Sequence, residues 1–74
     1  METEKSQEPV NLMEGLQIEI KRNKELIQQY LEIGNAVNFR IMMIQADIDV
    51  AEKTIREGDT VSMVKIYPRL KANK

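Results

Sequence analysis

The sequence has no cysteine, no histidine and no tryptophan among its 74 residues. Without cysteine the chain forms no disulfide, and without cysteine or histidine it lacks the usual ligands of a zinc site. A domain this short buries only about 60% of the surface that its unfolded chain exposes, so its stability is marginal without such aids. Association with a second copy is the aid that remains, and we therefore expect a homodimer.

The lack of a long apolar run and of a basic excess disfavours two further classes of function. No apolar run approaches the ~20 residues of a transmembrane helix, and an N-terminus with Glu2, Glu4 and Glu8 lacks the order of a signal peptide. Eleven basic and twelve acidic residues give a net charge of -1, whereas domains that bind phosphate backbones carry a basic excess. We expect a cytoplasmic protein without a membrane partner, and nucleic acid is disfavoured as a ligand.

The stretch from Asn38 to Glu57 has the most regular pattern, that of a helix with two apolar faces. One face repeats at spacings of three and four and comprises Ile41, Ile44, Ile48, Ala51 and Ile55. The other has the same spacing and comprises Phe39, Met43, Ala46 and Val50. At about 100° per residue the two sets lie on opposite sides, as in a helix between two layers. The alternative is one wide core face, with flexible Met42 and Met43 at its edge.

An earlier helix is predicted over Leu12–Ile33, with Asn11 as its N-cap and Glu14 in capping-box position. Its apolar seam contains one polar residue, Asn23, and comprises Met13, Leu16, Ile20, Asn23, Ile27 and Tyr30. A polar residue on a seam can fix register and partner number where two copies pair. Alternatively, the seam drifts around the helix and Asn23 lies at its wet edge.

Glycines mark the ends of both helices, at Gly34 and Gly58, and Asn38 is a candidate cap for the second helix. The short connection predicts an antiparallel hairpin. Asp59 or Thr60 then caps a third helix over residues 61–67, whose apolar residues Met63, Val64 and Tyr67 fold back onto the hairpin. Pro68 should end or kink this helix, leaving a frayed basic segment over residues 69–74.

These patterns predict an all-α fold, a helical hairpin plus a short third C-terminal helix in a homodimeric helical bundle. We expect a disordered N-terminal tail over residues 1–10, a single helical domain over residues 11–71 and a frayed tail over residues 72–74. The dimer and core seam is assigned to the apolar sets above, Asn23 included.

No constellation of residues predicts catalysis, a metal or a cofactor. The densest acidic group, Asp47, Asp49 and Glu52, is best explained as the solvated side of a helix, and the glycines are too scattered for a phosphate loop. We therefore expect a protein that is not an enzyme and that acts through its surface. The candidate partner-binding residues are Met63, Lys65, Tyr67, Arg69, Leu70 and Lys71. Either they cap the core, or they offer a partner an apolar anchor with a basic rim.

The chain also resembles small helical-hairpin proteins encoded by phages and prophages of Gram-negative bacteria. The likeness rests on residues 22–26, 30–34, 42–44, 47–48, 51–53 and 57–61, together with Phe39, Met63 and Tyr67. Asn38, Arg40 and Pro68 depart from that pattern. Since this group includes a dimeric quorum-sensing anti-activator, the resemblance implies a homodimer that binds and inhibits a protein of the bacterial host, such as a LuxR-type transcriptional regulator. A purely structural assembly module and, less favoured, a DNA-binding accessory protein are the alternatives.

Overall fold

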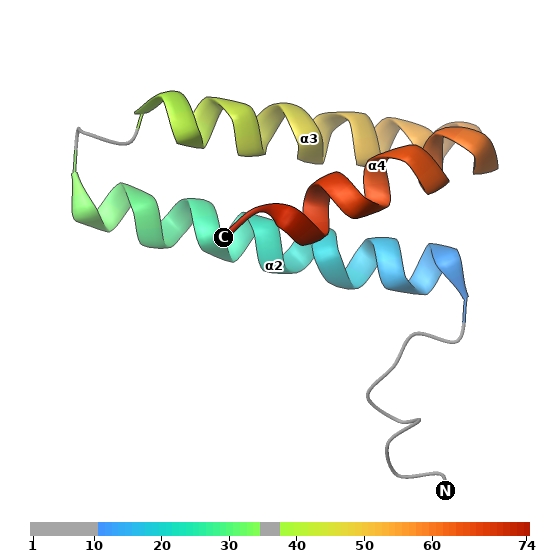
Figure 1. The fold of residues 1–74 in the computed structure, drawn as a ribbon, viewed down its shortest axis with the longest axis horizontal. Helices are drawn as coiled ribbons and strands as arrows, with labels where there is room; N and C mark the ends of the chain where they lie inside the picture. Colours follow the sequence, from blue (N-terminus) through green and yellow to red (C-terminus); the bar gives the residue numbers. More distant parts are fainter. Residues whose placement is uncertain (1–10, 35–37) are drawn as a thin grey trace, which may run out of the picture.

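Three α-helices make up the part of the chain that the computed structural model describes, residues 11–34 and 38–74, and these residues include no strand. They are α2 (Leu12–Ile33), α3 (Asn38–Glu57) and α4 (Thr60–Ala72). Helices α2 and α3 lie side by side as a hairpin, and α4 runs back across them, in contact with both (Figure 1). The predicted all-α fold with a hairpin and a third helix is confirmed.

The local signals that set the helix boundaries are largely as predicted. The Asn11 side chain accepts a hydrogen bond of 2.7 Å from the backbone N–H of Glu14, so Asn11 is the N-cap of α2. Gly34 and Gly58 follow α2 and α3 with φ values of 120° and 67°, which residues with a side chain rarely adopt. Asn38 is itself the first residue of α3 and not the residue before it, and residues 35–37 lie outside the described part.

The core is built by one stripe from each helix. Its fully or nearly fully buried members are Leu16, Ile20, Ile27, Ile44, Ile48, Ala51, Met63, Ile66 and Leu70. Met13, Tyr30, Ile41, Ile55 and Tyr67 are among the partly buried residues that pack around them. The first apolar face of α3, the stripe with Ile44 and Ile48, is therefore buried within a single chain.

Helix α4 is longer than the predicted third helix. It continues through Pro68 to Ala72, so the predicted end of the helix at Pro68 is wrong. An internal proline costs a helix about 3 kcal/mol, because it lacks the N–H that would bond the carbonyl four residues earlier. The residues beyond it are held by tertiary contacts: Leu70 is fully buried, and its carbonyl accepts hydrogen bonds from Arg22 (2.7 Å) and Asn23 (3.1 Å).

Asn23 has a role that neither prediction anticipated. It is fully buried in the interior of one chain, so it is neither at the wet edge of a seam nor on a surface where two copies could pair. Its Nδ2 donates to the carbonyls of Glu19 (2.7 Å) and Leu70 (3.1 Å), and its Oδ1 accepts from Asn73 Nδ2 (2.8 Å). The polar residue on the α2 seam therefore binds the end of α4.

Candidate protein-interaction surface

Asp47, Asp49 and Glu52 of α3 are engaged in contacts between or along helices. Asp47 is nearly buried and accepts hydrogen bonds from Arg69 Nε (3.1 Å) and Asn73 Nδ2 (3.1 Å), both from the C-terminal end of the chain. Glu52 forms an ion pair of 2.8 Å with Lys24, and this ion pair links α3 to α2. Asp49 accepts from Gln45 one turn earlier, at 2.9 Å. Within residues 11–34 and 38–74, no group of three potential metal ligands comes together.

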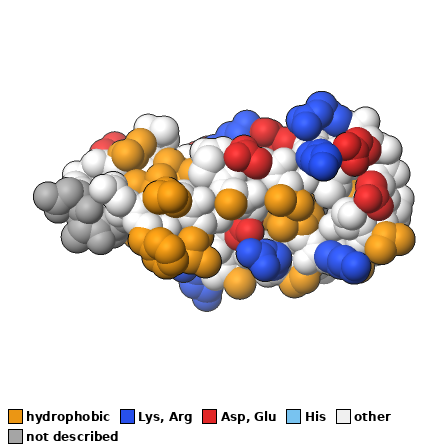
Figure 2. Space-filling model, turned by 90° about the horizontal axis from the view of Figure 1, so that it is seen from above, with side chains coloured by type: hydrophobic (Ala, Val, Ile, Leu, Met, Phe, Trp, Pro, Cys, Tyr) orange, Lys and Arg blue, Asp and Glu red, His pale blue; other side chains and the backbone are white. Residues whose placement is uncertain are grey.

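The second apolar face of α3 is uncovered. We define the α3 outer face as Phe39, Met42, Met43, Ala46 and Val50. The exposed fractions of its large members are 74% for Phe39, 68% for Met42, 43% for Met43 and 47% for Val50. In the view from above, hydrophobic side chains gather toward one end of the molecule (Figure 2). The predicted seam residues therefore divide, with one stripe in the core and the other at the surface.

Polar and charged residues border the α3 outer face on both long edges. On one edge, a groove of about 340 Å³ runs between α3 and α4, with Ala46, Val50 and Ile66 among its apolar lining residues and Lys65 and Arg69 among its polar ones. On the opposite edge lie Gln45, Asp49 and Lys53, all exposed, so this edge carries charges of both signs.

The predicted partner-binding residues of α4 are split between core and surface. Met63 and Leu70 are buried, and Tyr67 is partly buried, with Lys71 Nζ 5.3 Å from the centre of its ring. Lys65, Arg69 and Lys71 are exposed, and Arg69 forms an ion pair of 3.0 Å with Asp47.

Sequence reasoning missed the exposed apolar residues of α4. Val61, Val64 and Pro68 all lie at the surface, and Val64 was expected to fold back onto the hairpin. Their spacing of three and four was the available signal. It was not read because the helix was expected to stop before Pro68.

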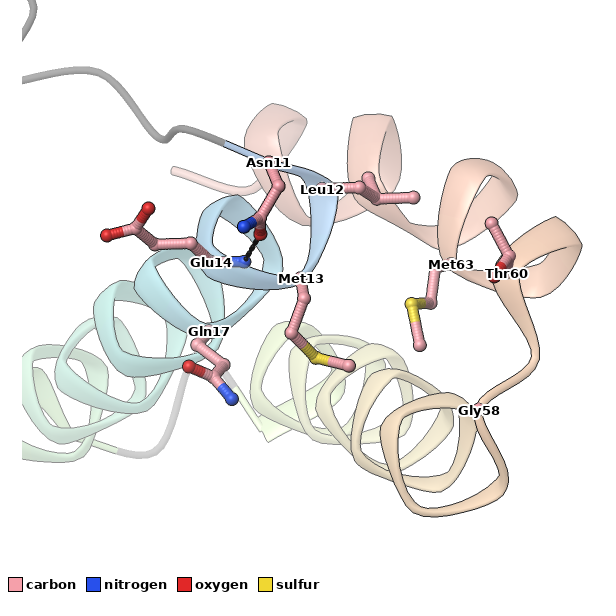
Figure 3. A pocket seen from close by; sticks show the side chains of 8 residues that line it. All are labelled: Asn11, Leu12, Met13, Glu14, Gln17, Gly58, Thr60 and Met63. Atoms are coloured by element: carbon pink, nitrogen blue, oxygen red, sulfur yellow. Dashed lines mark hydrogen bonds between the residues drawn. The ribbon is translucent and has the colours of Figure 1, made fainter.

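A further hollow, of about 480 Å³, lies at the end of the bundle between the start of α2 and the turn that joins α3 to α4 (Figure 3). The side chains of Leu12, Met13 and Met63 line it, with Gln17 and Thr60 among its polar residues. Glu14 is the one ionisable residue among those that line the hollow.

Comparison with protein-family models, with curated proteins and with solved structures finds no match for this chain. Within the described ranges, no helix combines the length and the apolar character needed to cross a bilayer.

Proposed function

We propose that this chain is a non-enzymatic binding protein that forms a homodimer through the α3 outer face and that binds and inhibits a protein of its bacterial host. The observation that carries the proposal is the exposure of the α3 outer face beside a complete core. Contiguous apolar surface of this kind is typical of protein interfaces. Methionine at two of its positions suits contacts that must adapt to a partner.

The energetic reason is that the α3 outer face contributes little to the folding of one chain. Burial of a large apolar side chain stabilises by about 1.5–3 kcal/mol, and the exposed fractions of Phe39, Met42, Met43 and Val50 in the single chain are 43–74%. A second copy brings the same stripe, so that both stripes can be removed from water at once. For a domain of 74 residues, that burial is a substantial addition to a marginal stability.

The surface that remains for the host protein is the outer side of α4. Here Val61, Val64 and Pro68 form an apolar ridge, and Lys71 lies along it. Such a ridge fits a shallow apolar groove with acidic residues at its rim, and it would mask that face of the target. The resemblance to phage and prophage hairpin proteins supports a transcriptional regulator of the LuxR type as the class of target. Cytoplasmic action belongs to the same proposal.

Sedimentation equilibrium tests the dimer. We expect the wild type to be a dimer at micromolar concentration, and Met43→Glu and Val50→Glu to be monomeric with unchanged helix content. Ile18→Glu is the matched control, because Ile18 on α2 has an exposed fraction of 49%, close to the 47% of Val50. A wild-type chain that stays monomeric at high micromolar concentration contradicts the proposal.

Capture from a Gram-negative lysate, followed by a binding assay with the purified host protein, tests the inhibitory role. We expect the wild type to retain one host protein in stoichiometric amount, and Val64→Glu, which should still dimerise, to lose it. If the dimer forms and no host protein is retained, the alternative of a structural assembly module without an inhibitory role is the better explanation.

A further inference from the structure

The groove between α3 and α4 continues the α3 outer face, because Ala46 and Val50 belong to both. Ile66 also lines this groove, and its side chain is part of the buried core. A second helix laid flat on the α3 outer face would leave the groove, of about 340 Å³, unfilled. The residues that line an unfilled space lose the contacts that a filled one provides. A partner that covers the whole surface must therefore present a large apolar side chain level with residues 46–50.

Phe39 is the largest side chain of the α3 outer face and has the highest exposed fraction, 74%. It lies seven residues before Ala46 and eleven before Val50. At 1.5 Å per residue, Phe39 is therefore about 10–16 Å along α3 from the groove of its own chain, too far to fill it. A second copy brings an identical Phe39, and the direction of pairing decides where that side chain lies.

Only an antiparallel pair brings Phe39 to the groove. In a parallel pair every residue of the stripe is level with itself, so the two Phe39 side chains meet at one end. In an antiparallel pair that covers the whole stripe, the two-fold axis crosses the midpoint of residues 39–50, and Phe39 of one copy is level with Val50 of the other. This axis is perpendicular to the helices, so α4 lies on the same side of the interface in both copies, and one operation fills both grooves.

We propose that two copies pair antiparallel through the α3 outer face, with Phe39 of each copy in the groove between α3 and α4 of the other. This proposal rests on the homodimer proposed above and adds its geometry. The two grooves then lie on opposite sides of the axis, about 10 Å apart along the helices. Lys65 and Arg69, which line each groove, are thereby separated from their counterparts by about a Debye length at physiological salt.

Cross-linking through single cysteines tests the direction, because the chain has no cysteine of its own. We expect Phe39→Cys and Val50→Cys each to stay unlinked alone on mild oxidation. In the antiparallel pair the two copies of either residue are about 16 Å apart along the helices, beyond the ~7 Å limit for a disulfide. An equimolar mixture of the two variants should yield the disulfide-linked heterodimer, which mass spectrometry identifies. A mixture of Phe39→Cys with Ile18→Cys is the control and should not link.

A double-mutant cycle tests the contact of Phe39 independently. Phe39→Ala should raise the dissociation constant of the dimer at least about a hundredfold, because two symmetric contacts are lost. Val50→Ala should raise it less. The effect of the double variant should fall short of the product of the single effects by at least about threefold, since the two residues meet only across the interface. Ile18→Ala, with an exposed fraction of 49% at residue 18, is the control and should leave the dissociation constant unchanged.

The outcomes separate this proposal from the one on which it rests. A monomeric wild type overturns both. A dimer in which either cysteine variant links alone, in which their mixture does not link, or in which the effects of Phe39→Ala and Val50→Ala multiply overturns the antiparallel contact and leaves the homodimer in place. Circular dichroism of every variant identifies any that lost affinity because it unfolded.

Discussion

Asn23 and Asn73, separated by 50 residues in the chain, share a hydrogen bond of 2.8 Å between their side-chain amides. The same Asn23 side chain donates to the carbonyl of Leu70, and Asn73 also donates to Asp47, which joins α3 to the contact. Among the described side chains, no buried polar atom lacks a partner. This satisfied polar cluster holds the end of α4 against the hairpin, where an apolar contact alone would leave backbone carbonyls unpaired.

Asn23→Ala should destabilise the fold, because it leaves the Leu70 carbonyl and the Asn73 amide without one partner each. Loss of partners for buried polar groups costs about 1–3 kcal/mol. Urea denaturation measures the change in the free energy of unfolding. Gln29→Ala, an exposed amide on the same helix, is the control and should change it by no more than about 0.5 kcal/mol. If the stability of Asn23→Ala were unchanged and its dimer affinity reduced, Asn23 would belong to the dimer contact.

Pro68→Ala should stabilise the protein. Alanine restores an N–H that can bond the Val64 carbonyl and removes the ring that crowds it, a gain of up to about 3 kcal/mol. Loss of the proline constraint on the unfolded chain offsets up to about 1 kcal/mol of this, so a net gain of about 1–2 kcal/mol is expected. Denaturation of Val64→Ala, one turn earlier on the same exposed side, supplies the comparison. A loss of stability in Pro68→Ala would show that the ring itself makes a needed contact.

Arg69→Gln should lower the free energy of unfolding by about 1 kcal/mol. Hydrogen bonds to charged groups contribute about 1.5–3 kcal/mol, and solvent screening reduces this contribution because the Arg69 side chain is 64% exposed. The effect should be absent when Asp47 is already replaced by Asn, since the two changes act on one contact. Lys65→Gln, measured below the dissociation constant of the dimer, is the control and should have no comparable effect.

Asp59 makes the start of α4 sensitive to acid. Hydrogen bonds from the Ser62 hydroxyl (2.7 Å) and then from its backbone N–H (3.1 Å) lower the pKa of Asp59 below its ordinary value of 3.8. Because the pKa in the folded state is depressed, this stabilisation is complete above about pH 4 and is lost as the pH falls through the folded value.

Asp59→Asn isolates that contribution, since asparagine is a good N-cap that does not titrate. We expect the stability of the wild type relative to Asp59→Asn to fall between pH 5 and pH 2. Thermal unfolding of both proteins at matched ionic strength measures the difference, in which the other carboxylates cancel. A difference that does not vary with pH would mean that the bonds to Ser62 do not depend on the charge of Asp59.

The sequence determined the local features of this protein. Helical periodicity, the side chains of Asn11 and Asp59 as caps, and glycines with positive φ at positions 34 and 58 depend on neighbours a few residues away. They therefore predict the hairpin and the bounds of α2 without knowledge of the packing. The two apolar stripes of α3 were visible for the same reason.

Tertiary structure decided which stripe of α3 became core, because two stripes of similar spacing are equivalent until the position of α4 is known. It also decided that Asn23 is buried and that the residues beyond Pro68 remain helical. The helical cost of a proline is local, whereas the contacts of Leu70 that offset it come from Arg22 and Asn23, 48 and 47 residues earlier in the chain. No local pattern could have revealed that compensation, since the groups that supply it meet only when α4 packs against α2.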